Sequence, residues 1–127
     1  MSTTLKNKLG AYLAAYAPLI TLVSTRIGPA ESEEDMAPPY VVYYQDSSRP
    51  EWTYDAESEE EIGIEIDCIG TSYTNAQAIA DAVQAALKAW LIPGSLIPQR
   101  VDRDDSYDVA TKRHYVTLQY EIWSNGR

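Results

Sequence analysis

Cysteine and histidine each occur once, as Cys68 and His114, and phenylalanine is absent. A lone cysteine cannot form an internal disulfide or supply the several thiolates of a structural zinc site, so we expect stability to come from packing. With a single histidine, any Ser/His/Asp or Cys/His arrangement would depend on that one residue. We therefore predict no catalytic residues.

Long apolar runs are also missing. The best one, from Ala14 to Val23, is interrupted by Pro18 and Thr21, and it falls short of the roughly 20 residues that a spanning helix needs. The N-terminus leads into an amphipathic pattern rather than the apolar block of a signal peptide. We expect no targeting to a membrane. The length predicts one globular domain over residues 1–127.

Positive charge is scarce, with 10 Lys and Arg against 19 Asp and Glu and a formal net charge of −9. Sequence-independent binding of nucleic acid depends on clustered Lys and Arg, so the composition argues against such binding. Most of the acidic residues fall in three stretches, Glu31–Asp35, Asp55–Glu61 and Asp102–Asp108. The plain interpretation is solvated loops and strand ends, and the sharper one is a concentrated negative surface.

Motifs for metals, phosphates or cofactors are lacking. The stretch from Asp102 resembles a calcium loop, but Tyr107 stands where that loop needs glycine and Arg113 where it needs glutamate. The six glycines form no phosphate-cradling loop at a helix start. We predict no metal site and no cofactor.

The N-terminal half contains two helical patterns and one strand pattern. Apolar residues recur at helical spacing from Leu5 to Tyr16, and Pro18 fits the first turn of a separate short helix over Ala17–Val23. Gly28–Pro29 is expected to open a polar loop. The β-branched and aromatic run Tyr40–Tyr44 predicts a strand, and Asp46–Tyr54 a projecting hairpin arm.

The C-terminal half alternates strand and helix patterns. Alternation over Glu61–Ile69 predicts a half-buried strand with Cys68 inside, and a helix with one apolar stripe follows a cap at Ser72–Asn75. Ser95–Arg103 is a weaker extended segment that Pro98 assigns to a sheet edge. Lys112–Trp123 alternates again and predicts a long closing strand.

This order of elements predicts an α+β fold, with an antiparallel-rich sheet of about four strands, helices packed on one face and a projecting hairpin or loop arm. The uncovered face mixes aromatic and polar residues, which suits contact with another subunit. Ten tyrosines and three tryptophans strengthen this expectation. The residues predicted at the subunit interface are Tyr44, Trp52, Tyr54, Tyr115 and Trp123.

Several segments in their order along the chain resemble the tail completion or tail terminator proteins of long-tailed bacteriophages. The resemblance spans Leu5 to Trp123 and lies in order and spacing rather than in one motif. The segments that carry it are Ala17–Val23 with Arg26–Ile27, Pro38–Tyr43, Ile64–Ile69, Ser72–Ala76, Ala82–Leu87, Tyr107–Asp108, Thr111–Val116 and Tyr120–Trp123. The acidic stretches at 31–35 and 55–61 depart from the family's pattern.

The resemblance implies a structural subunit of the virion without catalytic residues. Members form a ring, usually six-fold, at the head-proximal end of the tail tube, where they stop tube growth and join the tail to the head connector. The implied partners are further copies of the chain, the tail tube protein and the connector protein, with DNA passing through unbound. The implied location is the head–tail junction, after assembly in the host cytoplasm.

A negatively charged lumen would repel the phosphates of passing DNA. We therefore expect some of the acidic residues to line the channel, and the candidates are Glu57, Glu59, Glu60, Asp102, Asp104 and Asp105. Two other classes of function remain open. One is an acidic mimic of nucleic acid that blocks a basic partner, and the other is a small enzyme or ligand-binding domain that uses His114 or Cys68.

Overall fold

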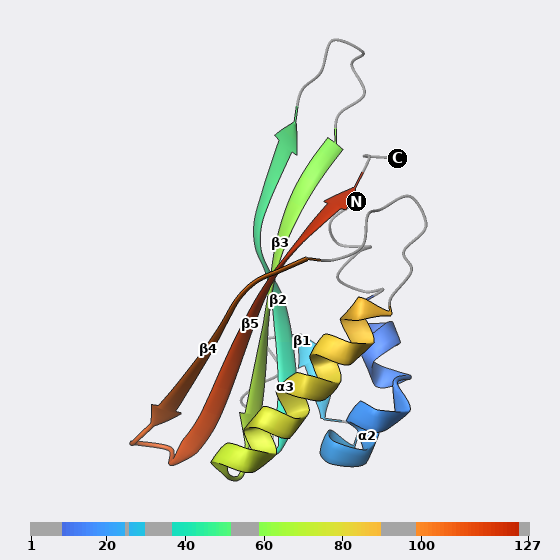
Figure 1. Cartoon of the computed structure of the whole chain (residues 1–127). Helices are drawn as coiled ribbons and strands as arrows, with labels where there is room; N and C mark the ends of the chain where they lie inside the picture. Colours follow the sequence, from blue (N-terminus) through green and yellow to red (C-terminus); the bar gives the residue numbers. More distant parts are fainter. Residues whose placement is uncertain (1–8, 25, 30–36, 52–58, 90–98, 125–127) are drawn as a thin grey trace.

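The computed structural model describes residues 9–24, 26–29, 37–51, 59–89 and 99–124. Residues 9–14 are helical and lead to helix α2, Ala17–Val23, and the short strand β1, Ile27–Pro29. A long hairpin of β2, Tyr40–Glu51, and β3, Glu59–Gly70, precedes helix α3, Tyr73–Lys88. A second hairpin of β4, Gln99–Asp108, and β5, Arg113–Ser124, completes the fold (Figure 1).

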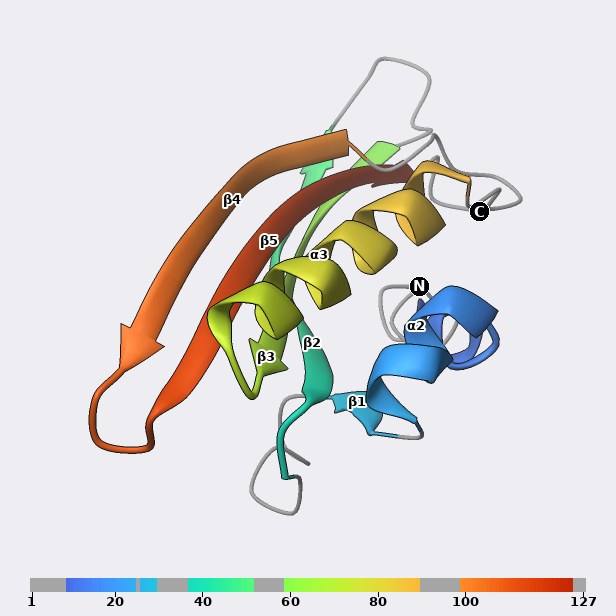
Figure 2. The same cartoon turned by 60° about the horizontal axis from the view of Figure 1, so that its bottom comes forward.

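The five strands form one sheet in the order β1-β2-β3-β5-β4. β1 runs parallel to β2, and every other neighbouring pair is antiparallel. Helices α2 and α3 lie on the same face of this curved sheet (Figure 2). The predicted α+β class, the antiparallel-rich sheet and the one-sided helical cover are thus confirmed.

Two sequence predictions about the sheet need correction. Ile27–Pro29 forms β1 and pairs with Val41–Tyr43 rather than opening a loop. A strand of three residues is too short to show an alternating pattern in the sequence. The edge strand β4 extends past the predicted end at Arg103 and includes the acidic residues up to Asp108. The sheet therefore has five strands instead of about four.

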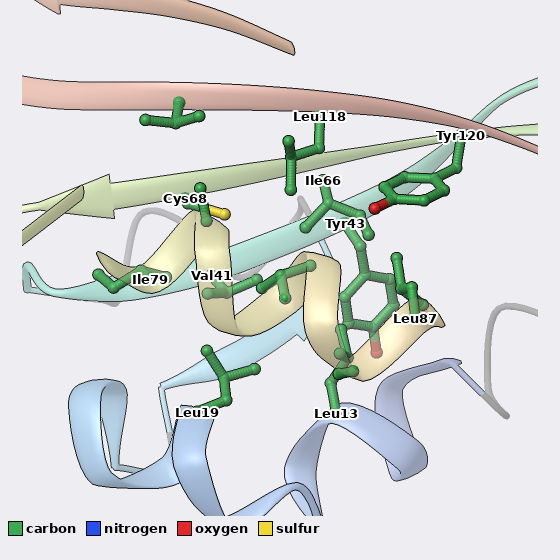
Figure 3. Close-up of a cluster of buried hydrophobic side chains, with 14 of the residues drawn as sticks. Leu13, Leu19, Val41, Tyr43, Ile66, Cys68, Ile79, Leu87, Leu118 and Tyr120 are labelled. Carbon is green, nitrogen blue, oxygen red and sulfur yellow. The ribbon is translucent and has the colours of Figure 1, made fainter. Parts of the chain in front are cut away.

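The core lies between the helices and the sheet (Figure 3). Alternate residues of the central strands point into it, and Cys68 is fully buried there, as the alternation predicts. α3 supplies the opposite side through small and branched residues at helical spacing, among them Ala76, Ile79 and Val83. The predicted cap is confirmed, because the Ser72 hydroxyl accepts a hydrogen bond from the Asn75 amide.

Gly70 makes the close connection between β3 and α3 possible. A Cβ atom at this position would meet the amide nitrogen of Ala76 and lie 2.7 Å from its Cα. Both obstacles are backbone atoms of the first turn of α3, so they cannot move aside without displacing the helix. Glycine therefore lets α3 pack directly back onto the strand that precedes it.

The tips of the two long hairpins lie at opposite ends of the sheet. The β2–β3 pairing reaches its connection at Glu51 and Glu59, whereas the β4–β5 pairing reaches its turn at Asp108 and Arg113. Pairing between β3 and β5 places Gly70 beside His114, and so fixes the β4–β5 turn at the start of α3. The β2–β3 hairpin extends away from this end, past the helices (Figure 1).

Candidate functional site

The candidate site is the sheet face turned away from α3, which we call the open face. On β5, Val116, Leu118 and Tyr120 are buried against the helices, so the alternating residues face the other way. The register joins such residues into rungs across β2, β3, β5 and β4. Three rungs, starting near the β4–β5 turn, are Tyr40, Ile69, Tyr115 and Ser106; Val42, Asp67, Thr117 and Asp104; and Tyr44, Glu65, Gln119 and Asp102.

The open face is strongly acidic. Its second and third rungs carry four carboxylates, and Glu121 of β5 follows on the next rung. Strands lie about 4.8 Å apart and alternate residues about 6.8 Å apart along a strand, so these groups share a small area. The carboxylates are Glu65, Asp67, Asp102, Asp104 and Glu121.

On β4, Asp102 and Asp104 interact directly. A hydrogen bond between the two side chains, followed by the negative charge of Asp102, raises the pKa of Asp104 above its ordinary value of 3.8. Partial desolvation and the charge of Asp105 act in the same direction. Both Asp102 and Asp104 are exposed, so the repulsion between them comes from their crowding on one strand face rather than from burial.

Glu65 joins three strands in the middle of the open face. Its carboxylate accepts a hydrogen bond from the Tyr44 hydroxyl of β2, and its other oxygen lies 3.4 Å from the Gln119 side-chain nitrogen of β5. These contacts hold Glu65 in a fixed place among the acidic residues. Tyr44, predicted at the subunit interface, is thus half-buried and already hydrogen-bonded within its own chain.

An apolar end borders the acidic area. Tyr40, Val42 and Ile69 form a second buried cluster, with Tyr115 packed against it. The Arg113 guanidinium donates a 2.8 Å hydrogen bond to the Tyr40 hydroxyl and lies 5.6 Å from the centre of its ring. Arg113 is therefore engaged at the margin of the open face, outside the rungs that carry the carboxylates.

The structure brings together some of the predicted residues and leaves others apart. Tyr44, Tyr115, Asp102 and Asp104 share the open face, whereas Asp105 pairs with the core residue Val116 and lies toward α3. Trp52, Tyr54 and Glu57 lie outside the described residues, and for Glu59, Glu60 and Trp123 the description covers only the strand backbone. Glu65, Asp67 and Glu121 were not among the predicted residues of the acidic surface, although the alternation of their strands points them outward.

Arg103 fixes the edge strand β4 to helix α3. It lies toward the helix, opposite Leu118, and its guanidinium contacts Asp81 at 3.0 Å. The same group donates hydrogen bonds to the side-chain oxygens of Gln77 and Gln84. This positive charge is therefore neutralised on the helical side and does not offset the acidic residues of the open face.

Cys68 and His114, the two residues considered for catalysis, have the surroundings of residues with a structural role. Burial, reinforced by the charge of Asp67, raises the pKa of the Cys68 thiol far above its usual range, so the reactive thiolate is disfavoured. The His114 ring packs 4.7 Å from the ring of Tyr107.

In the described part of the chain, no group of three or more His, Cys, Asp or Glu residues has a metal-binding arrangement. None of the described helices is long and apolar enough to cross a membrane.

Comparisons with known proteins agree with the resemblance seen in the sequence. A family model described as tail completion protein gp17 matches residues 7–125. Among solved structures, a chain from the virion of a native gene transfer agent particle superposes with a TM-score of 0.77 at 19% identity, over 93% of this chain and 92% of that chain. This likeness confirms the fold. No match was found among curated proteins.

Proposed function

Because this chain belongs to the tail completion protein gp17 family and is a structural protein of a phage tail, we propose that its copies form a closed ring at the head-proximal end of the tail tube. The ring ends tube growth and joins the tail to the head connector. The observation that carries this proposal is the family match, which covers nearly the whole chain from residue 7 to residue 125. Proteins of such structural families are not typically enzymes.

The open face provides the wall of the DNA channel in this proposal. Five carboxylates on neighbouring rungs give it one sign of charge. Facing the channel, this charge repels the phosphate backbone and keeps DNA from binding to the ring during passage. Asp102 and Asp104 of the predicted lumen residues belong to this wall, and Asp105, on the helical side of β4, lies apart from them.

The ring also requires contacts between copies. A closed ring is built from heterologous contacts, in which one patch of a subunit meets a different patch of its neighbour. The predicted contact residues Trp52 and Tyr54 belong to the segment that joins β2 and β3. In this proposal the β2–β3 hairpin reaches a neighbouring copy, while the tube protein and the connector protein occupy the two ends of the ring.

Deletion and add-back test the proposed role. The gene for this chain is deleted from its particle, and the products are examined by negative-stain electron microscopy with and without added purified protein. The proposal predicts overlong tails or tails unjoined beside filled heads, and their rescue by the added protein. Normal joined particles in the deletion would contradict it.

A further inference from the structure

Exposed apolar side chains gather at one end of the molecule. Among the described residues, the large hydrophobic side chains that are exposed are Tyr73 at 58%, Tyr107 at 49% and Val109 at 77%. Tyr73 begins α3, directly after β3 ends, whereas Tyr107 lies near the end of β4 and Val109 lies in the β4–β5 turn. The β3–β5 register places these elements at the same end of the sheet (Figure 2). We call these three residues the turn-end patch.

The turn-end patch is bordered by positive charge in a chain whose net charge is −9. Lys112 in the β4–β5 turn is exposed and Arg113 follows it. The N-terminus of α3 adds a partial positive charge, and its first turn contains no acidic residue to offset this. Two acidic residues also lie here: Asp105, exposed on the same face of β4 as Tyr107, and Asp108, whose carboxylate accepts a 3.0 Å hydrogen bond from the Ala110 amide.

The opposite end of the sheet has the opposite charge. The end of the β2–β3 hairpin, residues 46–51 and 59–61, contains five acidic residues and one basic residue, Arg49. We call this segment the acidic arm. Its strands pair with each other up to Glu51 and Glu59, the positions farthest from the β4–β5 turn.

The two ends of one molecule cannot meet. β5 runs the length of the sheet between them with 12 residues, a span of about 40 Å for an extended strand. The acidic arm can therefore reach a turn-end patch only on another copy. A contact between different ends of two copies is heterologous, which is the type of contact that closes a ring.

We propose that the turn-end patch of one copy binds the acidic arm of a second copy. This inference rests on the proposed ring, because it names the two patches that join its subunits. Lys112 and the α3 N-terminus attract the carboxylates of the arm, and burial of Tyr73, Tyr107 and Val109 contributes apolar area to the contact. A second copy is the occupant because the acidic arm supplies the charge that the patch attracts.

Charge reversal tests this contact. Lys112→Glu, Glu59→Lys and the double variant are compared with the intact chain by sedimentation velocity at low and high salt, and folding is checked by circular dichroism. We expect each single reversal to weaken self-association at least tenfold and the double variant to recover most of it. Lys88→Glu, the same change at an exposed site at the C-terminal end of α3, is the matched control and should associate normally.

Two results would overturn the proposed contact: single variants that associate like the intact chain, or a double variant as weak as the singles. The same proteins are added to extracts that lack the chain, and the amount retained on purified tails is measured, so that assembly confined to a tail is also scored. Failure of the intact chain to restore joined tails would reject the tail role. Full restoration by both single variants would reject only the contact.

Discussion

Asp102 and Asp104 lie on the same face of β4, and the interaction between their side chains raises the pKa of Asp104. Their register partners, Gln119 and Thr117, belong to the central part of the open face. The two acidic residues thus extend the acidic surface of β3 and β5 to the edge of the sheet. Crowding of like charge at exposed sites costs stability, and in the proposed ring this cost is offset by a function, the repulsion of DNA from the channel wall.

Asp104→Asn should stabilise the protein at neutral pH. The pKa of Asp104 is raised in the folded state, so between 3.8 and that raised value the folded state binds more protons than the unfolded state, and stability falls as pH rises. The amide removes this repulsion, and its advantage should disappear once pH falls below 3.8. Urea midpoints of the variant and the intact chain across this range measure the effect. A variant less stable at neutral pH would contradict the stated origin of the shift.

Arg103→Ala should destabilise the fold by about 1–2 kcal/mol, because it removes hydrogen bonds to two half-buried glutamines as well as an ion pair. Asp81→Asn removes only the pair with the exposed Asp81 carboxylate and should cost less than about 1 kcal/mol. Urea unfolding of both variants gives the comparison. Equal losses of unfolding free energy in the two variants would show that Arg103 stabilises the fold through the ion pair alone.

Ser24→Gly should raise the free energy of unfolding by about 1 kcal/mol, because it relieves backbone strain at the end of α2. Ser24 has φ 59 and ψ −129, a conformation that a side chain disfavours and glycine adopts freely. Ser24→Ala retains the strain and serves as the matched control. Thermal unfolding measures both variants, and a glycine variant no more stable than the alanine variant would remove the strain argument.

Reversing charge on the open face should impair DNA passage without preventing assembly. Particles carrying Asp102→Lys with Asp104→Lys should have joined tails but roughly tenfold lower infectivity, because the new cations hold passing phosphates. Asp105→Lys alters the neighbouring position, which lies toward α3, and should have little effect. Titres and the rate of DNA release provide the measurement. Equal damage from Asp105→Lys would exclude the open face as the wall.

Local sequence patterns predicted the elements that their own residues define. Pro18 in the first turn marked α2, and the alternation around Cys68 placed it in the core. The edge strand β4 was only partly predicted, because its helix-facing position at residue 103 holds an arginine whose partners come from α3. Such a strand has no apolar alternation to reveal it.

The acidic surface was predicted incompletely for a related reason. Alternation along β3 and β5 turns Glu65 and Glu121 outward, but only the register shows that Asp102 lies beside them across the sheet. Pairing between strands far apart in sequence cannot be derived from either strand alone. The turn-end patch escaped prediction because it joins the start of α3 to a hairpin turn more than 30 residues later.

The most direct test of the account is a cryo-electron microscopy reconstruction of the head-proximal end of the tail. We expect a closed ring of this chain between tube and connector, with the acidic open face toward the axis and α3 on the outside. A ring with α3 facing the channel would contradict the assigned lumen wall. Absence of the chain from this junction in joined particles would contradict the central claim.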